Sequence, residues 1–184
     1  GVREGDHIAV LMENRREFLE ICFAADRAGI YYTTNSTHLS ADEVDYIVRD
    51  CGAQLVIVSE PYAPLVGDLP AGCQMLVLGT RWDEAAAAMP PTPVPDERQG
   101  LDMLYSSGTT GRPKGIKWPL TGDAPGGHIM LIDLLTSLFG YDYDTRYLCP
   151  APLYHAAPLR HSMVTIKMGG AVFIMDKFDA RGAL

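Results

Sequence analysis

Short apolar runs alternate with helix-like segments in the first part of the chain. Strands are predicted where the apolar residues are contiguous, at residues 7–12, 30–34, 54–59 and 74–78. Helices are predicted between them, from an N-cap at Asn14 to Gly29, from a Ser40–Glu43 capping box to Gly52, near 62–66, and at 81–89. Strands and helices that alternate at this spacing are typical of βαβ units. We therefore expect an α/β fold with mainly parallel sheets flanked by helices.

A proline-rich stretch at residues 90–100 interrupts this pattern. It is long for a loop inside a compact domain, so it predicts a connection between two portions of the chain, 1–89 and 101–184. Beyond it the alternation returns. Strands are predicted at 101–105, 115–118, 147–149 and 171–175, and helices at 127–139 and 159–168.

Composition and charge narrow the classes of function. The 184 residues are 47% hydrophobic and 21% charged, which is typical of a globular protein. With 15 basic and 23 acidic residues the formal net charge is −8, so nucleic acid is not an expected partner. The most apolar stretch, 129–139, is far shorter than the roughly 20 residues that span a bilayer. The four cysteines lack metal-ligand spacing, which predicts a reduced, cytoplasmic chain with no metal site.

One segment has a composition that packing does not explain. Residues 106–115 contain four hydroxyl side chains, three glycines and Lys114 directly after an apolar strand. Glycines let backbone amides converge on an anion, hydroxyls add donors, and the lysine adds positive charge. The spacing is neither that of the common nucleotide loop nor that of a dinucleotide fingerprint. Two interpretations are open: a phosphate-binding loop, which we favour, or an ordinary turn between two strands.

Two stretches resemble a known family. Residues 105–115 (Tyr-Ser-Ser-Gly-Thr-Thr-Gly-Arg-Pro-Lys-Gly) resemble the phosphate-loop signature of the adenylate-forming enzymes, the acyl-CoA synthetase or AMP-binding family. Residues 149–158 (Cys-Pro-Ala-Pro-Leu-Tyr-His-Ala-Ala-Pro) are similar to the Pro-Leu-aromatic-His stretch of acyl-CoA synthetases. The resemblance covers nearly the whole chain. It implies part of the large N-terminal domain of such an enzyme, with the phosphate loop and the acyl pocket in 101–184.

The resemblance also implies a two-step reaction. A carboxylate attacks the α-phosphate of ATP to give an acyl-adenylate and pyrophosphate, and the thiol of coenzyme A then takes the acyl group. Mg2+ would offset the charge on the phosphates. The protein is therefore expected to be a cytoplasmic ligase of fatty acid or lipid metabolism that uses a small-molecule carboxylic acid, with homo-oligomerisation left open. The residues expected to bind ATP are Ser106, Ser107, Gly108, Thr109, Thr110, Gly111 and the catalytic Lys114.

Two further residues receive roles from the resemblance. His155 corresponds to a residue between the acyl carboxylate and the nucleotide phosphate, which implies a catalytic and acyl-adenylate-binding role. From the residues alone, a histidine in a proline-rich turn before a helix is the alternative. Lys177 resembles a lysine that reaches a phosphate of CoA, and a solvated lysine after a strand is the alternative. His161 is expected to pack or to line a pocket.

The resemblance ends at Leu184, before the points where the family carries its adenine and ribose motifs and the mobile C-terminal domain with its catalytic lysine. We therefore expect an N-terminal fragment that is inactive by itself. Residues 117–123 depart from the Thr-His-x-Asn segment of many relatives, which leaves the carboxylic acid open. Two rival hypotheses remain. One is a nucleotide-binding homologue without ligase activity, and the other is an adenylation domain that loads a carrier protein.

Overall fold

The computed structural model describes residues 1–92, 94–106, 112–126 and 130–184. The described chain forms two compact units. Unit 1 comprises Gly1–Met12 and Ala24–Pro125, and unit 2 comprises Glu13–Phe23 and Gly126–Leu184. The division expected from the proline-rich stretch at residues 90–100 stays a prediction.

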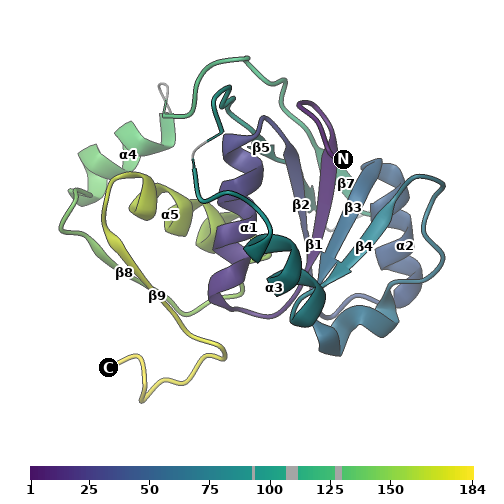
Figure 1. Ribbon diagram of the computed structural model, residues 1–184. Coiled ribbons are helices and arrows are strands. Elements are labelled where there is room, and N and C mark those ends of the chain that lie inside the picture. Colours follow the sequence, from purple (N-terminus) through teal and green to yellow (C-terminus); the bar gives the residue numbers. More distant parts are fainter. Residues whose placement is uncertain (93, 107–111, 127–129) are drawn as a thin grey trace. The chain divides into compact units, whose positions relative to one another are not determined.

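Unit 1 is built on a five-stranded parallel sheet, in the order β4-β3-β1-β2-β5 (Figure 1). Every residue of β1 and β2 is buried, as expected for parallel strands that are covered on both faces. The sheet confirms the predicted α/β fold with mainly parallel strands. The strands are β1 (His7–Leu11), β2 (Tyr31–Asn35), β3 (Ala53–Val58), β4 (Gln74–Val77) and β5 (Leu101–Asp102).

Helix α2 (Ala41–Asp50) covers one face of this sheet. It begins with the predicted capping box, in which the backbone N–H of Ser40 donates to the Glu43 carboxylate at 2.8 Å and the Ser40 hydroxyl accepts from the N–H of Glu43 at 3.4 Å. Its buried residues Val44 and Val48 pack in one cluster with apolar side chains of β1 and β3. The described part of unit 1 also contains the 3-10 helix η1 (Glu60–Leu65) and α3 (Thr80–Ala87). In α1 (Arg16–Arg27), residues 16–23 belong to unit 2 and residues 24–27 to unit 1.

The prediction of one continuous strand at 101–105 is wrong. The structure divides it into β5, in the parallel sheet, and β6 (Leu104–Ser106), which pairs antiparallel with β7 (Lys114–Ile116). Between them the N–H of Met103 still donates to the carbonyl oxygen of Tyr32 in β2 at 3.0 Å, and from Leu104 onward the chain pairs with β7 instead. A contiguous apolar run does not reveal that its two halves have different partners.

Unit 2 contains a second βαβ arrangement. β8 (Arg146–Cys149) and β9 (Ala171–Ile174) are parallel neighbours, and α5 (Ala156–Lys167) connects them. The buried side chains of α5 include Leu159, Met163 and Val164. Helix α4 (Met130–Phe139) precedes β8, and residues 127–129 of the predicted helix lie outside the described residues. In the part of the chain that the structure describes, no helix is long and apolar enough to cross a membrane.

Candidate functional site

The two described ends of the predicted phosphate loop lie opposite each other in unit 1. Ser106 ends β6, Lys114 begins β7, and the two residues are register partners in the antiparallel ribbon. Both side chains are exposed to solvent. The ribbon therefore brings together the first and last residues of the proposed ATP-binding set. The remaining members, Ser107, Gly108, Thr109, Thr110 and Gly111, lie outside the described residues.

The last turn of α2 holds both sides of this ribbon. The hydroxyl of Tyr105 donates to Oδ2 of Asp50 at 2.5 Å, and the hydroxyl of Tyr46 donates to the carbonyl oxygen of Pro113 at 3.2 Å. The guanidinium carbon of Arg112 lies 5.1 Å from the centre of the Tyr46 ring, which is cation–π distance. Tyr46 and Asp50 are not among the site residues predicted from the sequence. Their spacing of four residues places them on one face of a helix, but it does not show which segment they contact.

Gly115 allows the ribbon to pack closely against Tyr105. A Cβ atom at Gly115 would lie 3.0 Å from Cζ of Tyr105 and would overlap the terminal methyl group of Met103. Burial, and then the hydrogen bond to Asp50, raise the pKa of Tyr105 well above its ordinary value. The phenol therefore stays protonated and remains a hydrogen-bond donor to the carboxylate.

His155 occupies the N-cap position of α5 in unit 2. Its backbone is extended, with φ −89° and ψ 150°, and its side chain makes no capping hydrogen bond. The exposed imidazole ring lies 4.6 Å from the ring of Tyr154, between centroids. The turn before the helix is closed by a hydrogen bond of 3.1 Å from the N–H of His155 to the carbonyl oxygen of Pro152. The imidazole is thus presented to solvent at the start of a helix.

Asn14 joins the segments that carry His155 and Lys177. Its buried amide donates to the carbonyl oxygens of Ala151 at 3.0 Å and Met175 at 2.9 Å, and accepts from the N–H of Leu153 at 2.7 Å. The prediction that Asn14 caps α1 is therefore wrong, because the side chain binds distant backbone groups. Lys177 follows β9 with its side chain exposed. Asn14 thus links the backbone segments that precede His155 and Lys177 in unit 2. Ser106 and Lys114 belong to unit 1.

A second polar cluster in unit 1 fixes the segment after β7. Nζ of Lys117 lies 2.9 Å from Nε2 of His7 and 4.3 Å from the centre of the Tyr31 ring. The rings of His7 and Tyr31 are stacked, and the hydroxyl of Tyr31 donates to the carbonyl oxygen of Trp118 at 2.7 Å. Burial, and then the charge of Lys117, lower the pKa of His7 to about 4. A neutral imidazole therefore accepts from the ammonium group.

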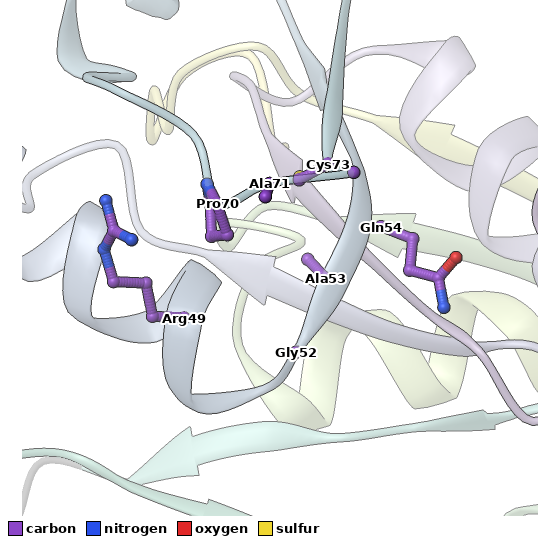
Figure 2. Close-up of a pocket in the computed structure, with 8 residues that line it drawn as sticks. Arg49, Gly52, Ala53, Gln54, Pro70, Ala71 and Cys73 are labelled. Carbon is purple, nitrogen blue, oxygen red and sulfur yellow. The ribbon is translucent and has the colours of Figure 1, made fainter.

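A hollow of about 470 Å³ lies in unit 1 beside the end of α2, the start of β3 and the loop before β4 (Figure 2). Its polar side chains are already engaged, since Arg49 binds Asp45 and the carbonyl oxygen of Asp68, and Gln54 binds Asp6. None of the predicted site residues that the structure describes lines it. Among the described residues, no group of three or more His, Cys, Asp or Glu side chains is placed to hold a metal ion.

Comparison with known proteins assigns the fold and then the family. The structure matches the N-terminal domain of FACL13 from Mycobacterium tuberculosis, solved with a bound inhibitor, with a TM-score of 0.83 and 26% identity over 100% of this chain and 47% of that chain. The model of the family described as AMP-binding enzyme matches residues 1–184. The chain belongs to this family, as the resemblance of its two motifs predicted.

Curated relatives include acid–CoA ligases. The chain is 34% identical over 189 residues to a feruloyl-CoA synthase of Amycolatopsis, covering 100% of this chain and 36% of the relative. It is 30% identical over 191 residues to the long-chain-fatty-acid–CoA ligase FadD13 of Mycobacterium tuberculosis, covering 98% of this chain and 37% of that protein. The chain therefore spans little more than a third of the length of these relatives.

Proposed function

We propose that the protein containing this chain is an ATP-dependent acid–thiol ligase. It would join a carboxylic acid to ATP as an acyl-adenylate, release pyrophosphate, and transfer the acyl group to coenzyme A. The observation that carries the proposal is the ribbon that pairs Ser106 with Lys114 at the ends of a glycine- and hydroxyl-rich segment. Membership of the AMP-binding family and the similarity to two acid–CoA ligases support it.

We assign the β- and γ-phosphates of ATP to the segment from Ser106 to Lys114. The exposed ammonium group of Lys114 supplies positive charge at one end, and the hydroxyls and backbone amides of the segment supply neutral donors. Mg2+ would enter as the magnesium complex of ATP and would offset phosphate charge. We assign this chain contacts with the phosphate oxygens.

His155 and Lys177 would act in different half-reactions. An imidazole exposed at a helix N-cap can donate to the charge that develops when the carboxylate attacks the α-phosphate. Lys177, exposed after β9, would bind a phosphate of CoA as a point charge. The amide of Asn14 holds the turn before His155 and the carbonyl oxygen of Met175, so one buried side chain supports both positions.

The acid we propose is hydrophobic, either aliphatic or ring-bearing. One of the two relatives is named for its feruloyl product and the other for long-chain fatty acids. Fatty acids are therefore one class of acid to be tested, and a role in fatty acid metabolism is one hypothesis. A cytoplasmic location is proposed because Cys22, Cys51, Cys73 and Cys149 are present as thiols and not as disulfides, as is usual in a reducing compartment.

A panel of acids tests the proposal. Pyrophosphate release by the protein that contains this chain is measured with ATP, Mg2+ and each acid, first without an acceptor and then with CoA or a carrier-protein thiol. We expect release that depends on a hydrophobic acid, and an acyl-CoA product. Acyl transfer to the carrier thiol but not to CoA would support a carrier-loading domain instead. ATP binding without release of pyrophosphate in the presence of any acid would support a nucleotide-binding homologue.

A further inference from the structure

The last turn of α2 carries two side chains that no step of the proposed reaction uses. We propose that Tyr46 and Asp50, together called the α2 clamp, are positioning residues that hold both ends of the phosphate loop for ATP. The proposal deepens the proposed function and rests on it. Its basis is that two contacts, one on each side of the loop, originate from the same helical turn.

The contact on the N-terminal side of the loop is a charge-assisted hydrogen bond. Tyr105 precedes Ser106, and its hydroxyl lies 2.5 Å from Oδ2 of Asp50. Such a bond to an ionised acceptor is shorter and stronger than a bond between neutral groups. The tight packing of Gly115 against the Tyr105 ring limits the movement of that ring. The residue next to the loop is therefore fixed both by packing and by a directional bond.

The contact on the C-terminal side is made by Tyr46. Its hydroxyl lies 3.2 Å from the carbonyl oxygen of Pro113 and 3.5 Å from Oδ1 of Asp50, so Pro113 offers the nearer acceptor. The ring of Tyr46 also faces the guanidinium group of Arg112. The two residues before Lys114 are thereby attached to the same turn of α2 as Tyr105.

Asp50 is suited to this role and unsuited to binding the nucleotide. An ionised carboxylate only accepts hydrogen bonds and would repel the phosphates of ATP. Asp50 instead accepts a hydrogen bond from the Tyr105 phenol and so stabilises the protein next to the loop. The clamp therefore acts through the backbone at the two described ends of the loop. It acts without contacting the substrate.

Fixed loop ends lower the cost of binding. When a segment orders around a ligand, the entropy that it loses counts against affinity, and ends that are already held leave less to lose. Breaking one contact of the clamp should therefore weaken the binding of ATP while leaving the binding of the acid unchanged. This selective effect separates a positioning role from a general loss of stability.

The test uses three substitutions in the protein that contains this chain: Tyr105→Phe, Tyr46→Phe and Asp50→Ala. Calorimetry measures the affinity for ATP with Mg2+, steady-state kinetics measures KM for ATP and for the acid, and hydrogen exchange measures protection of β7. We expect ATP affinity to fall roughly three- to tenfold, the range for one hydrogen bond of ordinary to moderate strength. KM for the acid should stay unchanged, and exchange in β7 should become faster.

Two control variants sharpen the result. Asp50→Asn retains an oxygen that can accept from Tyr105, so it should lose less ATP affinity than Asp50→Ala. Asp45→Ala removes a neighbouring carboxylate of α2 that pairs with Arg49 on the surface, and it should leave ATP affinity unchanged. Unchanged ATP affinity and unchanged β7 exchange in Tyr105→Phe and Asp50→Ala would overturn the clamp. A lower kcat in these variants, with the KM values for ATP and for the acid both unchanged, would also overturn it.

Failure of the proposed function gives a different result. If the unsubstituted protein binds ATP but releases no pyrophosphate with any acid, the ligase proposal falls, and the ATP affinities of the variants still decide the clamp. If the unsubstituted protein does not bind ATP, both proposals are overturned.

Discussion

The backbone N–H of Leu153 donates a hydrogen bond of 2.7 Å to Oδ1 of Asn14, a residue far away in the sequence. Leu153 is fully buried and lies two residues before His155, whose imidazole is exposed. The same Asn14 amide binds the carbonyl oxygens of Ala151 and Met175. One buried amide thus satisfies three backbone groups at the ends of β8 and β9, and it determines the course of the turn that presents His155.

Replacing Asn14 by Ala should destabilise the protein by about 2–4 kcal/mol, because buried backbone groups lose their partners. Urea unfolding, followed by circular dichroism, measures the change. Asn14→Asp keeps an acceptor for Leu153 but cannot donate to the two carbonyl oxygens, so it should also be destabilising. Arg16→Ala, which removes an exposed pair with Glu20, is the control and should change stability by no more than about 0.5 kcal/mol. An Asn14→Ala protein as stable as this control would contradict the bridging role.

Replacing Lys114 by Ala should slow acyl-adenylate formation about ten- to a hundredfold, since a hydrogen bond to a charged group contributes about 1.5–3 kcal/mol. Exchange of labelled pyrophosphate into ATP measures this half-reaction. Acid binding should change little, because the lysine is assigned to phosphate. Lys167→Ala removes a lysine from the last turn of α5 and serves as the matched control. Equal exchange rates in Lys114→Ala and the unsubstituted protein would show that the segment is only a turn between β6 and β7.

Much of the fold could be predicted from local signals. The three-residue spacing of Ser40 and Glu43 predicts the capping box that the structure contains. The contiguous apolar runs predict β1 to β4 to within one residue at each end. The division at Met103 could not be predicted, because local hydrophobicity does not identify the partner of a strand. It depends on the antiparallel pairing of Leu104–Ser106 with Lys114–Ile116, which the apolar run does not reveal.

The candidate site shows the same limit in its supporting residues. The composition of 106–115 and the Pro-Leu-Tyr-His stretch could be recognised because each is continuous in the sequence. Asn14 looked like a helix cap, since asparagine before an apolar helix usually is one. Its actual partners, like those of Tyr46 and Asp50, are brought close only by the folded chain. Their side chains therefore gave no local sign of a function.

His155→Ala and Lys177→Ala should affect opposite half-reactions. Loss of the imidazole should lower pyrophosphate–ATP exchange by about 10²-fold or more, the usual contribution of a positioned acid or base. Loss of the lysine should leave that exchange unchanged and raise the KM for CoA several-fold. His38→Ala, at an exposed histidine of unit 1, is the control for the first variant. A normal dependence on CoA in Lys177→Ala would assign that lysine to the solvated surface.

His7 should make stability depend on pH. The ring is 8% exposed, accepts from Lys117 through Nε2, and has a pKa lowered to about 4 by burial and then by the charge of Lys117, against an opposing effect of Asp6. Its Nδ1 has no hydrogen-bond partner among the described residues. Protonation would place a second positive charge against Lys117. The unfolded chain, in which the pKa is about 6.5, therefore binds the proton more readily.

The direction of the pH dependence follows from this difference in proton binding between the folded and unfolded chain. Between pH 6.5 and about 4 the unfolded state holds more protons than the folded state, so stability is complete above pH 6.5 and declines as the pH falls through this window. The decline due to His7 should not exceed about 3.5 kcal/mol, for a pKa difference of about 2.5 at 1.36 kcal/mol for each pKa unit. His7→Gln keeps an acceptor for Lys117 but does not titrate. Urea unfolding at pH 7.5 and 4.5 should therefore show a smaller loss of stability in His7→Gln than in the unsubstituted protein, whereas the exposed control His38→Gln should follow the unsubstituted protein. Identical losses in all three proteins would mean that His7 is protonated as easily in the folded chain as in the unfolded one.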